Sequence, residues 1–457
     1  MSNYYILGLD IGSVNVTAAM AKADDGNFSV CGIGKAKTSG IKKGIVTNIE
    51  KASYSIRKAV SEAKKSAGAR PDKVIISISG AYAKSVSSQG IVSIPNDEIT
   101  INEIKRAMQM AKDNARLDKD QIILHVLPYE FKVDGQEFIE DPIGMSGSRL
   151  EVCAHVITAE ENSVRNLLKA TQMAGLKIDS MVLSGYASAI STLSKDEKEL
   201  GVALIDVGGA TSDVIVHLGN SIRYNSVVPF GSSNITTDLS HALSTPLKDA
   251  EELKLNYTEF LNKGVKELNL PTIGESSTTH TASLDIITNV IYARIEEMLL
   301  LLANNLERGG YLKSGRLGAG IVLTGGMAKL DDIRNLTSLV FNNMPVRVAK
   351  PRMVAGLFEI SEDPENSCAL GLCLYGAGEF TAYEIDSNGE LKYQDNEIKN
   401  ISAIENLDNN QTKKSNTNET NETVNKEKIP IKISEISKNK EEIGVLTKFK
   451  NWLTQLF

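Results

Sequence analysis

The chain has 457 residues, of which 42% are hydrophobic and 23% are charged, with a formal net charge of -7. This length allows two to four domains, and the acidic balance argues against a nucleic-acid-binding protein, which needs a surplus of lysine and arginine. The four cysteines and five histidines show no metal-ligand spacing, so we expect reduced, structural thiols. Neither a signal peptide nor a transmembrane helix is predicted.

The first predicted element is a hairpin over residues 7–17, in which an apolar run leads into Asp-x-Gly, small polar residues and a second apolar run. Glycine lets backbone N–H groups approach an anion, and hydroxyl side chains add donors. A carboxylate cannot face a phosphate, so its useful role is to hold Mg²⁺, directly or through water. The candidates are Asp10 for Mg²⁺ and Gly12, Ser13 and Asn15 for phosphate. A single Asp-Gly turn is weak evidence, because such turns commonly close hairpins.

A group of short elements follows between residues 72 and 151. One strand closes in Ser79-Gly80, Thr100 precedes an amphipathic helix predicted over 101–115, and Asp134-Gly135 is a two-residue hairpin signal. None of these stretches has the spacing of an active site. They predict a small α/β module with surface loops.

The hairpin pattern returns over residues 203–215. Its candidates are Asp206 for Mg²⁺ and Gly208, Gly209 and Thr211 for phosphate. Two copies, one in each half of the chain, predict two related subdomains that hold one nucleotide from opposite sides.

Two later stretches complete the predicted core. Glu251 and Lys254 share one face of a helix at i,i+3, a spacing that by itself favours a surface ion pair. A buried-type strand over residues 321–324 ends in two glycines, which leave a flat surface for a purine and ribose. An ordinary strand-to-helix turn has the same pattern. The candidates at this turn are Gly325, Gly326 and Met327.

Together, the two hairpins and the Thr-Gly-Gly turn resemble the phosphate-1, phosphate-2 and adenosine motifs of the actin, Hsp70 and sugar-kinase superfamily. The elements between residues 72 and 151 look like the inserted domain 1C of the bacterial cell-division actins, the FtsA family. The resemblance runs from residue 4 to about 380. It implies an α/β, actin-like (duplicated RNase H-like) ATPase core with an inserted small α/β domain, with ATP and Mg²⁺ as ligands. It also implies that Glu251 and Lys254 lie near ribose and adenine.

The same resemblance gives domain boundaries. Subdomain 1A takes residues 1–83 with 163–196 and 356–380, domain 1C takes 84–162, subdomain 2A takes 197–233 with 305–355, and subdomain 2B takes 234–304. Residues 381–441 are predicted to be a disordered linker, because their central part is almost wholly polar and cannot bury a core.

The final predicted element is an amphipathic helix over residues 442–457. Its polar side carries Lys448 and Lys450. A helix of this kind behind a long tether favours an interfacial anchor on an anionic membrane, with the single tryptophan at the headgroup boundary. The alternative is a helix that docks on its own domain. The predicted membrane-facing residues are Val445, Leu446, Phe449, Trp452, Leu453, Leu456 and Phe457.

One departure from the superfamily concerns catalysis. Ser184 falls at or near the place where many relatives carry the Glu or Gln that orients the attacking water. A hydroxyl is a poor general base at neutral pH. We therefore expect at most a slow ATPase, in which the nucleotide serves as an assembly switch.

The resemblance implies a protein that polymerises on the cytoplasmic face of the inner membrane at the division site. It would anchor the tubulin-like protein FtsZ through subdomain 2B and recruit later division proteins through domain 1C. One alternative is a metabolic kinase of the same fold, which would need a substrate pocket with a general-base Asp. A second is a PilM-like pilus-assembly ATPase. The amphipathic tail argues against both.

Overall fold

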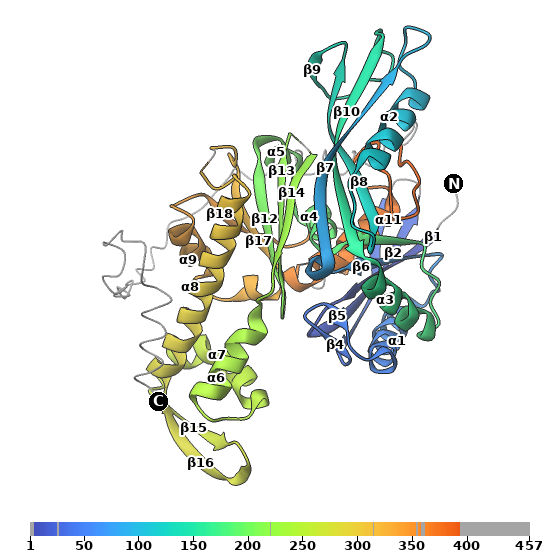
Figure 1. Cartoon of the computed structure of the whole chain (residues 1–457). Coiled ribbons are helices and arrows are strands. Elements are labelled where there is room, and N and C mark those ends of the chain that lie inside the picture. Colours follow the sequence, from blue (N-terminus) through green and yellow to red (C-terminus); the bar gives the residue numbers. More distant parts are fainter. Residues whose placement is uncertain are drawn as a thin grey trace, which may run out of the picture. The chain divides into compact units, whose positions relative to one another are not determined.

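The computed structural model describes residues 4–24, 27–219, 221–313, 315–352, 355–357 and 362–393, with the backbone alone described at 275–277 (Figure 1). Most of the predicted linker, from residue 394, and the whole predicted amphipathic helix lie outside these residues. The described residues form the core and the insert.

The first sheet forms around the first Asp-x-Gly hairpin. Its strand order is β11-β6-β1-β2-β3-β19, with β1, β2 and β3 antiparallel and β6 parallel to β1. Gly32 and Gly34 in β3 let α1 approach closely, because a Cβ on either would overlap backbone atoms of α1. The strands are β1 (Tyr4–Ile11), β2 (Asn15–Asp24), β3 (Asn27–Lys37), β6 (Lys73–Ile78), β11 (Ser180–Leu183) and β19 (Ala355–Gly356). Helices α1 (Ile49–Ala67) and α3 (Glu161–Met173) pack together, beside the small pair β4 (Ile41–Lys42) and β5 (Ile45–Val46).

The second sheet repeats this connectivity. Its order is β14-β13-β12-β17-β18. The pairs β12-β13 and β13-β14 are antiparallel, and the pairs β12-β17 and β17-β18 are parallel. The shared order confirms the predicted duplicated core. The strands are β12 (Val202–Val207), β13 (Ser212–Leu218), β14 (Ser221–Val228), β17 (Gly320–Thr324) and β18 (Val346–Val348). The short helices of this half are α5 (Lys195–Leu200), η2 (Gly326–Lys329) and α9 (Ile333–Val340).

The insert leaves the first sheet after β6 and has its own core, formed between α2 and a sheet of order β7-β10-β8-β9. Its elements are η1 (Gly80–Tyr82), β7 (Ala83–Ser93), α2 (Ile101–Asn114), β8 (Gln121–Val133), β9 (Gln136–Ile139) and β10 (Arg149–Glu160). Thr100 and Glu103 form a capping box at the start of α2, and the helix ends one residue before the predicted Ala115. Asp134 and Gly135 both have positive φ, as a tight hairpin turn requires. The predicted α/β module is confirmed.

The segment between β14 and β17 forms a helical region with a hairpin. It consists of α6 (Ser232–Ala242), α7 (Leu247–Asn262), β15 (Glu267–Thr272), β16 (Glu275–Ser283) and α8 (Leu284–Arg308). Helix α8 packs against both α6 and α7. The boundary predicted at residue 304 falls inside α8. The helix continues past this point, and its buried face extends to Leu306.

Two buried helices connect the halves of the core. Helix α4 (Ser184–Thr192) leads from the first sheet towards the second, and α11 (Ser367–Ala377) packs on β1 and β6 of the first sheet. The two helices touch at Gly371, where a Cβ would lie 1.8 Å from the carbonyl oxygen of Ala187. Only glycine fits at this crossing without moving one helix.

Residues 381–393, which we predicted to begin the disordered linker, are instead packed against the core, and we call them the clip. Ile385 pairs with Val126 of β8 through two backbone hydrogen bonds of 2.9 and 3.0 Å. Glu384 is fully buried and accepts hydrogen bonds from the hydroxyls of Tyr186 and Tyr375, at 2.7 and 2.5 Å. The prediction was wrong here because it extended the polar composition of the linker's central part to this segment, where two buried tyrosines satisfy the carboxylate of Glu384.

Candidate nucleotide-binding site

The two Asp-x-Gly hairpins face each other across a cavity of about 80 Å³. The tips of the hairpins touch, since a Cβ on Gly209 would lie 2.2 Å from Cγ2 of Val14. Asn15 begins β2 and does not line this cavity. The structure thus brings together most of the predicted phosphate and Mg²⁺ residues: Asp10, Gly12, Ser13, Asp206, Gly208, Gly209 and Thr211.

Three carboxylates meet at this cavity, and each accepts a hydrogen bond from a serine. Asp10 of the first half accepts from Ser77 at the end of β6, at 2.9 Å. The two carboxylates of the second half, Asp206 and Asp213, are cross-strand neighbours on β12 and β13. Both accept from serines one turn apart on α4: Ser188 donates to Asp206 at 2.5 Å, and Ser184 donates to Asp213 at 2.8 Å. Helix α4 therefore ties the second hairpin to the first half.

Burial dominates the electrostatics of the three carboxylates. It raises the pKa of Asp10, against a smaller opposing effect of the hydrogen bond from Ser77. It raises the pKa of Asp206 to about 6. Burial and then the charge of Asp206 raise the pKa of Asp213 to about 7. Charged carboxylates are therefore disfavoured in this cavity unless a cation joins them.

Replacing Asp213 with Asn should stabilise the nucleotide-free protein at high pH. The folded state holds the proton of Asp213 more tightly than the unfolded state does, so the contribution of this group to stability is lost as the pH rises through about 7. The shift from 3.8 to about 7 corresponds to roughly 4 kcal/mol at pH 8, at most, and to less at pH 5. Urea unfolding of both proteins at the two pH values measures this difference.

Asp113→Asn, which changes an exposed carboxylate on α2, provides the control and should leave the pH dependence of unfolding unchanged. An Asp213→Asn protein whose advantage over the wild type is the same at pH 5 and pH 8 would contradict a raised pKa for Asp213.

The predicted pair Glu251 and Lys254 lies on α7 as a compact cluster. Lys254 is 5% exposed, and its Nζ lies 2.7 Å from Glu251 Oε2 and 3.1 Å from Thr236 Oγ1 on α6. The Thr236 hydroxyl also donates to Glu251. The pair is therefore more than a surface ion pair, because the ammonium is buried between two helices. These residues do not line the cavity between the hairpins.

The predicted glycine turn after β17 lies directly behind the second hairpin. Gly325 has φ 85°, and a Cβ there would lie 2.3 Å from Asp206 Oδ1. Gly326 lies beside the Glu365 side chain. The side chain of Met327 is only 2% exposed and belongs to the core of the second half, so only its backbone can contact a ligand.

The sequence interpretation missed several members of this site. Asp213 lies within the hairpin predicted over residues 203–215 but was not singled out, although a second carboxylate seven residues after Asp206 on the paired strand was a usable signal. Ser77 and Ser188 gave no signal, because serine is common and their partners are distant in sequence. Cys368 also lines the cavity.

The residues present fit a Mg²⁺-bound polyphosphate. None of the three carboxylates forms an ion pair with a lysine, arginine or histidine in the described part of the chain, so a dication would supply the missing positive charge. No group of three metal-ligating side chains that could hold an ion directly is found within the described ranges. Ser13 Oγ accepts from the Gly44 N–H at 2.8 Å, which leaves its own proton for an anion.

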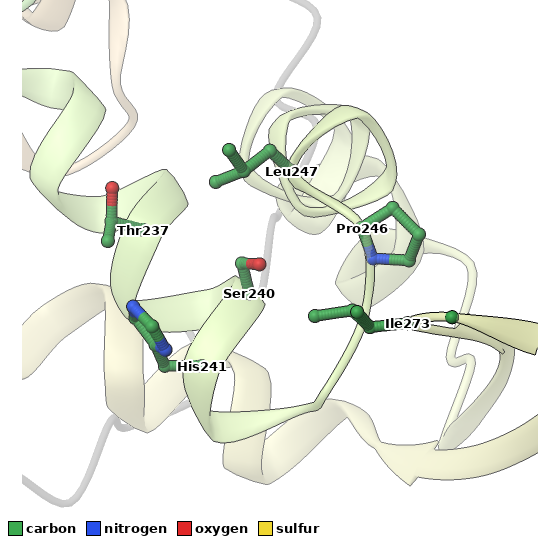
Figure 2. Close-up of a pocket in the computed structure, with 7 residues that line it drawn as sticks. Thr237, Ser240, His241, Pro246, Leu247 and Ile273 are labelled. Atoms are coloured by element: carbon green, nitrogen blue, oxygen red, sulfur yellow. The ribbon is translucent and has the colours of Figure 1, made fainter.

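A second pocket, of about 490 Å³, lies between α6, α7 and the β15–β16 turn. Figure 2 shows Leu247 and Ile273 pointing into the space beside Ser240. These two apolar side chains are 59% and 54% exposed. The pocket is therefore a partly apolar surface of the region predicted as subdomain 2B.

The duplicated sheets, the facing Asp-x-Gly hairpins and the two helices that cross between the halves define a protein of the actin-like class. Among solved structures, the PilM–PilN type IV pilus biogenesis complex matches with a TM-score of 0.58 and 17% identity, over 81% of this chain and 98% of that chain. At this identity the match shows the fold alone.

Sequence comparisons narrow the class to one family. Residues 80–158 match the family model of the SHS2 domain inserted in FtsA, and residues 203–371 match that of the cell division protein FtsA. FtsA of Helicobacter pylori is 38% identical over 424 residues, 86% of each chain. FtsA of Escherichia coli K12 is 31% identical over 400 residues, which cover 85% of this chain and 93% of the relative. The chain belongs to the FtsA family of cell division proteins.

None of the helices in the described part of the chain is both long and apolar enough to cross a bilayer.

Proposed function

We propose that this protein binds Mg-ATP between its two halves and polymerises on the cytoplasmic face of the inner membrane at the division site, where it anchors FtsZ. The observation that carries the nucleotide assignment is the convergence of Asp10, Asp206 and Asp213 on one cavity, among whose described lining residues there is no lysine, arginine or histidine. Family membership supports the role in division.

In this proposal the hairpins hold the phosphates, and Glu251, Lys254 and the turn at Gly325 contact ribose and adenine. When bound, the Mg²⁺ ion would neutralise the phosphates and the carboxylates together. The Ser184 hydroxyl already donates its proton to Asp213, so it can accept a hydrogen bond from a water but cannot donate one. This arrangement supports slow hydrolysis, with the nucleotide serving as an assembly switch.

Replacing Asp10 with Ala should weaken the binding of Mg-ATP roughly tenfold more than the binding of metal-free ATP, a difference of about 1.4 kcal/mol. The physical reason is that Asp10 serves the cation and not the phosphate. Titration calorimetry with and without EDTA measures both affinities. Asp196→Ala, an exposed carboxylate on α5, is the control. Unchanged Mg-ATP affinity in the Asp10 variant would remove it from the site.

The proposed partner surfaces are the pocket in subdomain 2B and the surface of the insert. The pocket bordered by Leu247 and Ile273 supports FtsZ binding through subdomain 2B, since an exposed apolar hollow suits a short peptide with apolar side chains. Self-association into filaments would position many such pockets in a row. The separately folded insert would recruit later division proteins through domain 1C.

The membrane contact would be made by the predicted helix over residues 442–457, on an anionic surface. The number of tails in a polymer would then set how long the protein stays bound, because linked weak contacts reinforce one another.

Co-pelleting tests the whole proposal. FtsZ should pellet with anionic liposomes only when this protein and Mg-ATP are both present. Leu247→Glu should leave this protein on the liposomes but release FtsZ, because a charge would enter the apolar pocket. Leu339→Glu, an equally exposed leucine on α9, is the matched control. FtsZ that pellets equally well without this protein would contradict the anchoring role.

A further inference from the structure

The strand that leads into the insert also forms part of the cavity between the hairpins. β6 ends at Ile78, and both Ser77 and Ser79 line the cavity. The next residue, Gly80, begins η1, and β7 of the insert follows directly after η1. Only three residues therefore separate the cavity wall from the first strand of the insert.

Gly80 contacts the second half of the core. Its backbone packs directly against the side-chain carboxylate of Asp213. A Cβ on Gly80 would lie 2.2 Å from Asp213 Oδ1 and 3.2 Å from Cβ of Val227, so only glycine allows this approach. The entry to the insert and the Ser184 hydroxyl thus share one carboxylate of the second hairpin.

The insert also rests on the second half through its own sheet. His155 Nε2 on β10 donates to Asn225 Oδ1 on β14 at 2.7 Å, and both residues are buried. The guanidinium of Arg223 lies over the Tyr129 ring, 4.1 Å from its centroid. The insert is therefore joined covalently to the first half and packed on the edge strand of the second, which pairs with the strand of Asp213.

We infer that Asp213 and Gly80 couple the nucleotide site to the insert. When a ligand in the cavity moves the Asp213 carboxylate, the group against which Gly80 packs moves with it, and η1 and β7 must follow. The insert would then present its surface differently in the nucleotide-bound and nucleotide-free states. This inference rests on the proposed nucleotide site. It adds a physical connection from that site to the surface of the insert.

Hydrogen–deuterium exchange of the full chain, with and without Mg-ATP, tests this coupling. In the wild type, Mg-ATP should change the exchange of residues 80–93 and of β14. Gly80→Ala inserts a methyl group against Asp213, and Asp213→Ala removes the carboxylate that Gly80 contacts without adding bulk. Both variants should lose the change over residues 80–93. Asp113→Ala is the matched control, because it removes an exposed carboxylate from α2 of the insert, away from both the cavity and the contact between the halves, and it should keep the change.

Nucleotide binding is measured in parallel by calorimetry, which separates the two proposals. A wild type that binds Mg-ATP without any change over residues 80–93 overturns the coupling and leaves the nucleotide site standing. The coupling is also overturned if Asp213→Ala binds Mg-ATP and keeps the change. A wild type that does not bind Mg-ATP overturns both.

Discussion

A chain that ends at residue 442 should stay in the supernatant under conditions in which the full chain pellets with anionic liposomes and Mg-ATP. The missing segment carries the seven predicted membrane-facing residues. Burying about half of each of these side chains contributes roughly 1 kcal/mol apiece, or on the order of 7 kcal/mol in all before the cost of ordering the helix. Lys448 and Lys450 add about 1 kcal/mol each on an anionic leaflet.

The cost of ordering the helix offsets part of this gross gain. We therefore expect a single tail to bind more weakly than about micromolar, which corresponds to about 8 kcal/mol. Monomers should exchange on and off the liposomes, and polymers should remain. Trp452→Glu should reproduce the deletion, whereas Gln455→Glu adds the same charge to the polar side and should pellet nearly as well as the wild type. ATP binding should be intact in all of these variants. A truncated chain that still pellets with liposomes would refute the anchor.

Replacing Gly371 with Ala should destabilise the core by roughly 3 kcal/mol, at the upper end of overpacking effects. The added Cβ would lie 1.8 Å from the carbonyl oxygen of Ala187, and a backbone atom cannot move aside as a flexible side chain can. The helices α4 and α11 would have to separate, which also shifts Ser184 and Ser188 away from their carboxylates. Urea unfolding measures the loss of stability, and calorimetry measures the accompanying loss of nucleotide affinity.

Gly68→Ala is the control for this substitution. Gly68 has φ 63° at the end of α1, and a Cβ there meets nothing within 4 Å, so only the left-handed conformation costs free energy, about 1 kcal/mol. Nucleotide affinity should be unchanged in this variant. Equal effects of the two substitutions would show that the crossing of α4 and α11 tolerates a side chain.

Local patterns predicted the parts of the fold that depend on neighbouring residues. The hairpin of β1 and β2 follows from alternating apolar residues and one Asp-Gly turn, and so does that of β12 and β13. The start of α2 follows from Thr100 and Glu103, a local capping signal. The duplicated architecture then followed from finding the same hairpin twice.

The site was only half predictable, because its hydrogen bonds join distant residues. Ser77 lies 67 positions from Asp10, and Ser184 lies 29 positions from Asp213. The prediction for the clip was wrong for a related reason. Disorder was predicted from the polar central part of residues 381–441. In the clip, however, two tyrosines from α4 and α11 donate hydrogen bonds to Glu384, which no local pattern reveals.

The clip also determines how the fold would carry a mechanical load. The chain passes from α11 into the clip, so tension applied at the C-terminal end reaches the clip before it reaches α11. The clip is hydrogen-bonded to β8 of the insert through Ile385. It is hydrogen-bonded to the first sheet through Ser387, whose Oγ accepts from the Met181 N–H at 3.0 Å. Traction is therefore divided among the insert, the first sheet and α4, which the clip reaches through the hydrogen bond from Tyr186 to Glu384.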